Sequence, residues 1–380
     1  MRRRTVTSSG KPRVLVLFGG RSSEHSVSCV TAAGVLDAID RNKYDVVPVG
    51  IAKNGQWSLV SSDPAQWSLR SSVLPEVPAS PESVVLATAT GEGQAQELVA
   101  TSSDRMPRSL GEVDVVLPLL HGPFGEDGTL QGMLEMADVR YVGAGVLASA
   151  VGMDKHYMKV VFASAGLTVG PYEVITDREW SRDRSVSLER ASRLGFPVFV
   201  KPARAGSSMG ITRATSPAEL ETAVEAAREF DPKVIVEAGI VGREIEVAVL
   251  QGRSTNDPRT SLPGEIAVQP GEHEWYDFEA KYVDGSAAEL SCPADLPPDV
   301  TERVRELAAR AFDALGTEGL SRVDFFYTPA GELIINEINT MPGFTPISMY
   351  PQMWAKSGLT YTELIDELIA LALERKTGLR

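Results

Sequence analysis

A predicted hairpin near the C-terminal end of the chain constrains the fold more than any other segment. Two β-rich runs, 322–327 and 333–339, flank a short turn that contains glycine, and this pattern is typical of two antiparallel strands. Apolar residues flank the polar ones on both runs, so we expect the strands to be buried. Buried charged side chains need partners or a metal ion. A solvated hairpin face is the alternative, but the apolar flanks favour a binding site.

The predicted pairing brings the polar side chains of the hairpin together. With a turn centred on residues 330–331, Asp324 lies opposite Glu337, and Arg322 lies opposite Asn339. Because side chains alternate between the two faces of a strand, we expect one face to carry Arg322, Asp324, Phe326, Ile335, Glu337 and Asn339.

The chemistry of this face indicates a metal and phosphate site. Two carboxylates directly opposite each other repel. Carboxylate and amide oxygens are ligands that Mg²⁺ prefers, with phosphate oxygens completing its coordination. The adjacent guanidinium suits a phosphate or a developing oxyanion.

Composition excludes several other classes of protein. The 380 residues suffice for two or three domains, and a net charge of −14 argues against a nucleic-acid-binding surface. Cys29 and Cys292 form no CxxC pair, so neither zinc nor a disulfide framework is indicated. The basic start, 1–12, lacks the apolar run of a signal peptide and is expected to be a disordered tail. We find no apolar run long enough to span a membrane, and reduced cysteines fit a cytoplasmic protein.

Strands, glycine-rich loops and helices alternate along the chain, which predicts an α/β fold. The run 13–18 is apolar throughout, as in a buried parallel strand, and a Gly-Gly loop and a helix follow it. The segment 61–110 is an irregular insertion with a possible hairpin at 83–87 and 97–101. Residues 271–295 form a long polar and aromatic segment, whose length suggests a functional loop. The other strands are expected at 46–51, 113–120, 195–202, 233–237, 243–250 and 264–268. The other helices are expected at about 129–136, 154–165 and 300–315, and a further helix is expected to start at 216–219.

The loop that follows the strand 195–202 has the composition of an anion-binding loop. Lys201 ends the strand, and Gly206, Ser207 and Ser208 follow it. Glycines let backbone N–H groups approach an anion, and serine hydroxyls add further donors. A solvent-exposed turn is the alternative. A second lysine, Lys155, and the acidic hairpin favour phosphate binding.

Several further residues are weaker candidates when they are taken singly. Glu237 ends a strand where backbone groups can contact a base, and Glu244 can accept hydrogen bonds from ribose hydroxyls, but both are equally compatible with surface carboxylates. His121 lies at the C-terminal end of a strand, where open α/β sheets bind ligands. Glu24, near the start of a helix, is favourable there for electrostatic reasons alone.

Together, these segments resemble the D-alanine–D-alanine ligases of the ATP-grasp superfamily from about residue 13 to 360. Two motifs carry the resemblance. One is His121-Gly-Pro-Phe-Gly-Glu-Asp-Gly-Thr-Leu-Gln-Gly132, and the other joins Gly319-Leu-Ser-Arg322-Val-Asp324 to Glu337-Ile-Asn339-Thr-Met-Pro-Gly343. The resemblance implies three domains: an N-terminal open α/β domain, 13–143, and two α+β domains, 144–237 and 238–380, that clamp ATP.

The resemblance implies an activity and a role for each matching residue. ATP would phosphorylate one D-alanine, and the amine of a second D-alanine would displace the phosphate. At the amino-acid end, the resemblance implies Glu24, His121, Ser207, Tyr282, Arg322, Gly343, Ser348 and Met349. At the nucleotide end, it implies Lys155, Lys201, Ser207, Ser208, Glu237, Ala238, Ile240, Glu244, Trp275, Lys281 and Phe326. Asp324, Glu337 and Asn339 would bind two Mg²⁺ or Mn²⁺ ions. A monovalent cation, a homodimer and a lid around 281–282 are also implied.

The chain departs from the family pattern at a few positions, and other functions remain open. Ala203 and Ala205 replace residues that are often polar, and Met349 replaces a common leucine. Tyr282 favours an amine over a hydroxy acid as second substrate. The alternatives are a D-alanyl-D-lactate ligase, another ATP-grasp carboxylate–amine ligase, and a nucleotide-binding regulatory protein that has lost catalysis.

Overall fold

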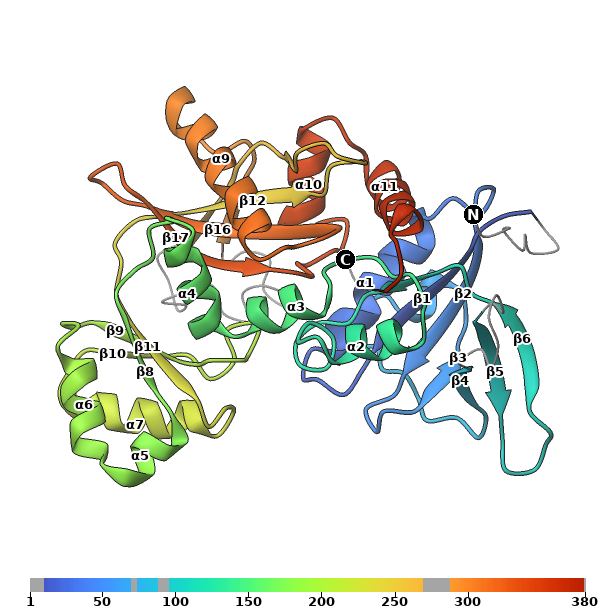
Figure 1. Cartoon of the computed structure of the whole chain (residues 1–380), viewed down its shortest axis with the longest axis horizontal. Coiled ribbons are helices and arrows are strands. Elements are labelled where there is room, and N and C mark those ends of the chain that lie inside the picture. Colours follow the sequence, from blue (N-terminus) through green and yellow to red (C-terminus); the bar gives the residue numbers. More distant parts are fainter. Residues whose placement is uncertain (1–9, 70–73, 88–95, 269–287, 379–380) are drawn as a thin grey trace.

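The computed structural model describes residues 10–69, 74–87, 96–268 and 288–378 and arranges them in three α/β regions (Figure 1). Three candidate site residues, Trp275, Lys281 and Tyr282, lie outside the described residues, as does most of the expected tail 1–12.

The N-terminal region is built on the parallel sheet that the apolar run predicted. Strand β1 (Arg13–Gly19) pairs in parallel with β2 (Asp45–Ile51) on one side and with β7 (Val115–Pro118) on the other. Strand β3 (Trp57–Leu59) adds an antiparallel edge to β2. The helices of this region are α1 (His25–Ala38), the 3₁₀ helix η1 (Pro64–Gln66) and α2 (Thr129–Met136).

The insertion 61–110 contains more strand than the sequence indicated. The predicted hairpin is confirmed as β4 (Ser83–Ala87) and β5 (Glu97–Thr101). A third strand, β6 (Arg108–Glu112), pairs with β5. The sequence of β6 is short and polar and the strand lies at an edge, so no apolar alternation marks it.

The central region is an antiparallel sheet with strand order β10-β9-β11-β8. Its helices cover one face (Figure 1), where Trp180, Ala191 and Leu220 pack against the sheet. The strands are β8 (Tyr172–Ile175), β9 (Val198–Pro202), β10 (Thr212–Ala214) and β11 (Val234–Ala238), and the helices are α5 (Asp177–Arg182), α6 (Arg184–Ser192) and α7 (Pro217–Arg228).

The C-terminal region carries the sheet with strand order β15-β14-β12-β16-β17, and β13 pairs with β12. Strand β15 lies within the segment 271–295 that we expected to be a loop. Its pairing partner, β14, is distant in sequence, and the segment itself shows no strand pattern. The strands are β12 (Arg243–Leu250), β13 (Arg259–Thr260), β14 (Gly264–Val268), β15 (Ala288–Ser291), β16 (Leu320–Tyr327) and β17 (Leu333–Asn339), and the helices are α9 (Pro298–Ala314), α10 (Met349–Lys356) and α11 (Tyr361–Glu374).

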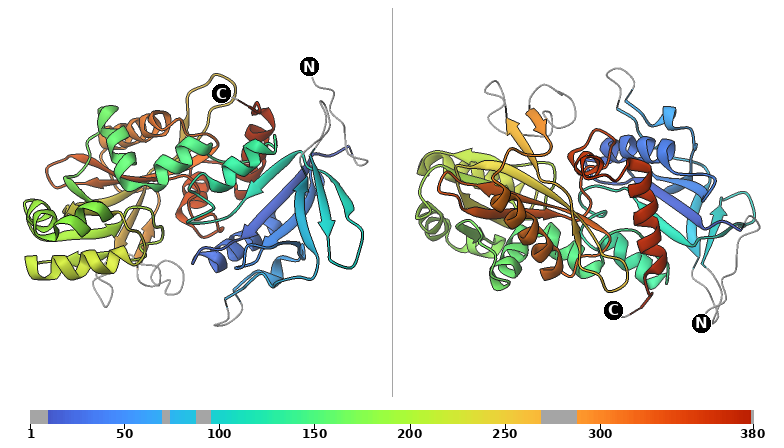
Figure 2. Two further views of the ribbon diagram at one scale, coloured as in Figure 1. Left: turned by 60° about the horizontal axis from the view of Figure 1, so that its bottom comes forward. Right: turned by 90° about the horizontal axis from the view of Figure 1, so that it is seen from above.

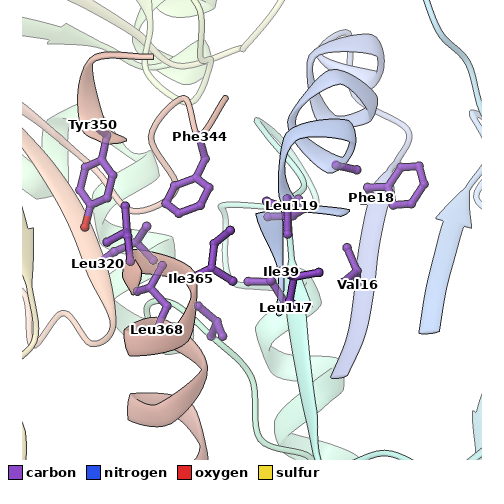
Figure 3. Close-up of a cluster of buried hydrophobic side chains, with 14 of the residues drawn as sticks. Val16, Phe18, Ile39, Leu117, Leu119, Leu320, Phe344, Tyr350, Ile365 and Leu368 are labelled. Atoms are coloured by element: carbon purple, nitrogen blue, oxygen red, sulfur yellow. The ribbon is translucent and has the colours of Figure 1, made fainter. Parts of the chain in front are cut away.

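Helices that belong to one region by sequence complete the core of another. Two helices that precede the central sheet, α3 (Val146–Met153) and α4 (Lys155–Ser164), contribute Ala148 and Phe162 to the core beneath the C-terminal sheet. Helix α11 lies beside the N-terminal region (Figure 2), where Ile365 and Leu368 point toward Leu117 (Figure 3). The shared cores hold the three regions around a common centre.

The hairpin at that centre has the predicted pairing, with one correction. Asp324 pairs with Glu337, and Arg322 pairs with Asn339. A β-bulge shifts the register after Asp324, so Ile335 pairs with Phe325. Both side chains lie in the hydrophobic core. The prediction that Ile335 shares the polar face was therefore wrong, because a bulge interrupts the alternation of side chains.

Within the ranges given above, no helix has both the length and the apolar composition needed to cross a membrane.

Candidate active site

One large cavity of about 1280 Å³ lies where residues of all three regions meet. Its wall includes every described residue that the sequence predicted for a site. These residues are Glu24, His121, Lys155, Lys201, Ser207, Ser208, Glu237, Ala238, Ile240, Glu244, Arg322, Asp324, Phe326, Glu337, Asn339, Gly343, Ser348 and Met349.

The hairpin places a guanidinium against a carboxylate at the floor of this cavity. Arg322 Nε lies 2.7 Å from Asp324 Oδ1, and Nη2 lies 2.6 Å from Oδ2. Asn339 Nδ2 donates to Asp324 Oδ2 at 3.0 Å. Burial of Arg322 opposes its charge, but Asp324 and Glu246 outweigh this effect and raise the pKa of the guanidinium well above its usual value.

Glu246 is a neighbour of this pair that the sequence analysis missed. It lies on β12 directly opposite Asp324, which in turn lies opposite Glu337 on β17. Three carboxylates thus follow one another across three strands. Arg322 Nε also lies 3.1 Å from Glu246 Oε1, so the guanidinium balances two of the three charges. Alternation along β12 placed Glu246 on the same face as Glu244, which was the available signal.

The donor set of the hairpin fits a hard divalent cation. Carboxylate and amide oxygens are its usual ligands, and Asp324, Glu337 and Asn339 supply them from paired positions. Because the amide nitrogen of Asn339 faces Asp324, the amide oxygen is the group available to a cation. Among the described side chains, no three carboxylate, imidazole or thiolate groups form a ready metal cluster. A cation here would therefore need oxygens from a second ligand such as a phosphate.

Two of the lysines that line the cavity near the hairpin were predicted from the sequence. Lys155, at the start of α4, donates to the carbonyl oxygen of Ala205 at 2.8 Å and lies 4.0 Å from Glu337 Oε2. Lys201, at the end of β9, lies 2.5 Å from Glu237 Oε2. Burial opposes the charge of Lys201, but Glu237 raises the pKa of its ammonium. Both ammonium groups belong to residues that line the same cavity as the carboxylates.

Glu237 lies between two lysines, one of which the sequence analysis missed. Its second oxygen, Oε1, lies 2.8 Å from Nζ of Lys159. Burial opposes ionisation of Glu237, but the two ammonium groups outweigh it and lower the pKa of the carboxyl. Lys159 follows Lys155 by four positions, so both face the same side of α4. That spacing was the signal for Lys159.

The Gly/Ser loop brings the N-terminal and central regions into contact. Ser207 Oγ donates a hydrogen bond to Glu24 Oε1. Ser207 and Ser208 have positive φ angles of 47° and 58°, a conformation that residues other than glycine rarely adopt. A Cβ at Gly206 would approach Glu24 Oε2 to 3.0 Å, so a side chain there would require the carboxylate of Glu24 to shift. Strain of this type is common at ligand sites.

His121 and Glu126 both contact the backbone of Met341 and thereby connect the N-terminal region to the segment after the hairpin. The distance from His121 Nδ1 to the Met341 carbonyl oxygen is 3.2 Å, and burial lowers the pKa of the imidazole. Glu126 accepts a hydrogen bond from the Gly122 backbone at 2.7 Å. Burial, followed by the charge of Glu24, raises the pKa of Glu126 to about 8, although the backbone of Met341 acts in the opposite direction. Glu126 lies within the motif at 121–132 but was not predicted as a site residue.

The segment from Gly343 to Met349 forms another part of the cavity wall. Ser348 is the N-cap residue of α10. Its hydroxyl accepts a hydrogen bond from the Thr345 backbone at 3.2 Å and lies 2.7 Å from Thr345 Oγ1. Met349 is buried in the core between the regions, which agrees with a contact through its backbone. A helix N-terminus suits a carboxylate ligand.

The remaining candidates line the cavity on the side of Glu237. Ala238 ends β11, and Ile240 follows it. Glu244 on β12 pairs with Phe326 on β16. The cavity therefore combines an apolar wall, three lysines and a carboxylate-rich hairpin at one end with Glu24, His121 and Ser207 at the other. This arrangement suits a phosphate-bearing aromatic ligand beside a small molecule that carries an ammonium group.

Known protein families match nearly the whole chain. The family described as "D-ala D-ala ligase N-terminus" matches residues 13–144, and "D-ala D-ala ligase C-terminus" matches residues 161–370. A D-alanine–D-alanine ligase of Arthrobacter sp. (strain FB24) is 70% identical over 380 residues, which cover 100% of this chain and 99% of the relative. The protein of the same name from Paenarthrobacter aurescens (strain TC1) is 69% identical over 372 residues, which cover 98% of both chains.

Solved structures of related enzymes share the fold. The VanG D-Ala:D-Ser ligase of Enterococcus faecalis has a TM-score of 0.78 at 34% identity and covers 95% of this chain and 99% of its own. The D-alanine–D-alanine ligase of Coxiella burnetii has a TM-score of 0.78 at 33% identity and covers 96% of this chain and 95% of its own.

Proposed function

The chain belongs to the D-alanine–D-alanine ligase family, and we propose how its residues carry out the reaction of that family. It has the ATP-grasp architecture and is an ATP-dependent ligase that joins two D-alanines into D-alanyl-D-alanine for peptidoglycan synthesis. One observation of the structure supports this function most directly. The nucleotide-type and amino-acid-type residues line the same cavity, with Arg322 at its floor.

The reaction has two steps. A carboxylate oxygen of the first D-alanine attacks the γ-phosphorus of ATP, so that an O–P bond forms, the bond to the bridging oxygen breaks and ADP leaves. The amine of the second D-alanine then attacks the acyl carbon. A C–N bond forms, the amine loses a proton and inorganic phosphate leaves. Positioning and electrostatic stabilisation supply most of the catalysis in reactions of this kind.

The roles at the amino-acid end follow from the resemblance to the family, and the contact between Ser207 and Glu24 supports them. Its buried carboxylate binds the ammonium of the first D-alanine, with His121 beside it. Ser207, which donates to Glu24, forms with Tyr282 the pair that orients the second amine and helps deprotonate it. Arg322 and the Gly343 backbone stabilise the acyl phosphate and the tetrahedral oxyanion. Ser348 and the Met349 backbone bind the carboxylate of the second D-alanine.

The roles at the nucleotide end also follow from the resemblance to the family, and the lysines and the apolar wall of the cavity support them. Lys155, Lys201 and Lys281 bind phosphates of ATP, and Ser208 adds a donor from the Gly/Ser loop. Glu237, Ala238, Ile240 and Glu244 bind adenine and ribose, with Trp275 and Phe326 on either side of the base. Asp324, Glu337 and Asn339 would hold two Mg²⁺ or Mn²⁺ ions, which neutralise phosphate charge when bound.

Further properties follow from the family and are part of the proposal. The domains are 13–143, 144–237 and 238–380, the location is cytoplasmic, and the chain forms a homodimer. Light scattering after size exclusion tests the oligomeric state, because a mass near 41 kDa, that of one 40.9 kDa chain, would exclude the dimer. Activity after replacement of K⁺ by Na⁺ tests for a monovalent cation.

The decisive experiment measures ADP and product together. Purified protein with Mg²⁺ and ATP should release ADP when D-alanine is added but not when L-alanine is added, and mass spectrometry should detect the D-alanine dipeptide. No D-alanine-dependent ADP release would refute the function and would favour a nucleotide-binding protein without catalysis.

A different second substrate is the specific alternative. One structural relative is titled a D-Ala:D-Ser ligase, so the second site of this fold can take another molecule. D-serine and D-lactate should each compete against D-alanine in the same assay. Because Tyr282 favours an amine, we expect no D-lactate product. Preferential formation of D-alanyl-D-lactate or D-alanyl-D-serine would replace the assignment of the second substrate.

A further inference from the structure

Lys159 is a buried lysine of the cavity wall to which the proposed mechanism gives no role. Its side chain is 3% exposed, and its ammonium nitrogen has two acceptors. Glu237 Oε1 lies at 2.8 Å, and the carbonyl oxygen of Asn336 lies at 3.2 Å. Lysine is rarely this deeply buried unless it is paired, so these two contacts define its role.

The carboxylate that Lys159 contacts is shared with a second lysine. The other oxygen of Glu237, Oε2, lies 2.5 Å from Lys201 Nζ. The three side chains come from three elements: α4, β11 and β9. Two ammonium groups and one carboxylate leave the cluster with a net positive charge, and all three residues line the cavity.

Because Glu237 contacts both lysines, the contact with Lys159 affects how readily Lys201 can bind a phosphate. Glu237 and Lys201 alone would form a neutral pair, and a phosphate would have to compete with Glu237 for the ammonium. With Lys159 bound to one oxygen, Glu237 is already neutralised and holds Lys201 less strongly. A buried ion pair is weak evidence for stability, because the cost of desolvation offsets much of the attraction. A role in ligand binding is therefore the better explanation for Lys159.

Resting on the proposed function, we infer that Lys159 is a positioning residue of the phosphate end, which neutralises Glu237 so that Lys201 can bind a phosphate of the nucleotide. Its bond to Asn336 has a related effect. Asn336 lies beside the bulge of β17 and immediately before Glu337. Lys159 thereby connects α4, which also carries Lys155, to the hairpin that carries the proposed cation ligands.

The test compares the affinities of Lys159→Met for nucleotides with and without phosphates. Loss of one charged hydrogen bond typically costs about 10- to 100-fold in binding. We expect weakening of this size for ATP and ADP in isothermal titration calorimetry, while the affinity for adenosine stays within about twofold. The KM for D-alanine should change little. Unchanged ATP affinity, or equal weakening of ATP and adenosine, would overturn the inference.

The chain offers a matched control for the loss of a buried ion pair. Lys233 is 15% exposed and lies 2.8 Å from Asp154 Oδ1, outside the described wall of the cavity. Lys233→Met should lower thermal stability to a similar extent but leave ATP affinity unchanged. Lys159→Arg, which retains the charge, should retain most of the ATP affinity. If Lys159→Met does not fold, Lys159→Gln removes the charge but keeps a hydrogen-bond donor for Asn336, and it carries the same test.

A double-variant comparison tests whether Lys159 acts through Glu237. In Glu237→Gln the carboxylate charge is absent, so Lys159 has nothing to neutralise. The ratio of ATP to adenosine affinity should then be the same in Glu237→Gln and in Lys159→Met/Glu237→Gln, as expected for coupled residues. A further loss of about tenfold in the double variant would refute this coupling. If the unmodified chain binds ATP and forms the dipeptide but Lys159→Met has normal ATP affinity, only the inference fails. If the unmodified chain binds no nucleotide, both the proposed function and the inference fail.

Discussion

Arg322 binds both carboxylate oxygens of Asp324, at 2.7 Å from Nε to Oδ1 and 2.6 Å from Nη2 to Oδ2. The same carboxylate is the proposed cation ligand, so Arg322 and a cation compete for it. Glu246, 3.1 Å from Arg322 Nε, remains as a partner for the guanidinium when Asp324 turns to a cation. The guanidinium of Arg322 therefore keeps a carboxylate partner, Glu246, when Asp324 binds a cation.

Asp324→Asn should lower turnover by about 100-fold or more, because a bound cation contributes several kcal/mol to the stabilisation of developing charge. The neutral amide is a weaker ligand, so raising the Mg²⁺ concentration should recover part of the activity. Steady-state kinetics over a Mg²⁺ series measure both effects. Asp177→Asn removes a carboxylate that pairs with Arg228 at the surface and should leave the rate unchanged. A normal rate at ordinary Mg²⁺ for Asp324→Asn would contradict the ligand assignment.

Ser207→Ala should lower kcat by about 10-fold or more with little change in the KM for ATP, because Glu24 loses a charge-assisted hydrogen bond. Ser254→Ala is a matched control, since Ser254 also has a positive φ angle, 57° compared with 47° at Ser207, and is exposed. Both variants thus place alanine in the same strained region. Kinetics with D-alanine and ATP varied separately make the comparison. Equal effects of the two variants would indicate that backbone strain, and not the contact with Glu24, is responsible.

The pH dependence of stability should reveal Glu126, whose pKa is raised from 4.5 to about 8 by burial and by Glu24. The folded chain then binds this proton more tightly than the unfolded chain. Its contribution to stability is fully present below about pH 4.5 and is lost as the pH rises through about 8. Glu126→Gln cannot lose this proton.

Urea unfolding of the ligand-free protein between pH 6 and 9 measures this contribution. The unmodified chain should lose stability relative to Glu126→Gln as the pH rises. A difference that stays constant with pH would show that Glu126 is already ionised at pH 6 in the folded chain. Glu189→Gln, at an exposed position that is paired with Arg193, should give a constant difference and serves as the control.

Local patterns were sufficient to predict strand β1 and both strands of the hairpin with their pairing, but not β6 or β15. The apolar run of β1 predicted a buried parallel strand, because a strand covered on both faces has no need of alternation. The length of the turn predicted that Asp324 lies opposite Glu337. Ile335 was placed on the wrong face because a single inserted residue reverses the alternation, and no residue type in 333–339 marks the bulge.

The residues that sequence analysis missed depend on contacts between distant segments. In the sequence, Lys159 and Glu246 look like ordinary charged residues of a helix and a strand. Lys159 reaches the site because α4 packs near β11, and Glu246 reaches it because β12 pairs with β16. The raised pKa of Glu126 likewise depends on burial and on the approach of Glu24. Resemblance to the family predicted which residues are expected to contact substrates. It did not predict the side chains that position those residues.

Arg375 connects the C-terminal end of helix α11 to the N-terminal region. Arg375, which follows α11, donates to the carbonyl oxygens of Tyr141 and Gly143 at 2.8 and 3.0 Å, pairs with Glu318, and lies over the Tyr141 ring at 4.2 Å. Its side chain is 7% exposed. Arg375→Met would leave the two carbonyl groups without this donor and would remove one partner of Glu318, so it should lower the free energy of unfolding by about 3 kcal/mol.

Arg253→Met is the control for this variant, because Arg253 also contacts α11, through Glu367 and Glu374, but its side chain is 45% exposed. Exposed ion pairs are worth about 1 kcal/mol or less, so this variant should be much less destabilised. Urea unfolding curves at one pH and one salt concentration compare the two. Equal destabilisation would mean that Arg375 contributes no more than a surface ion pair to the contact between α11 and the N-terminal region.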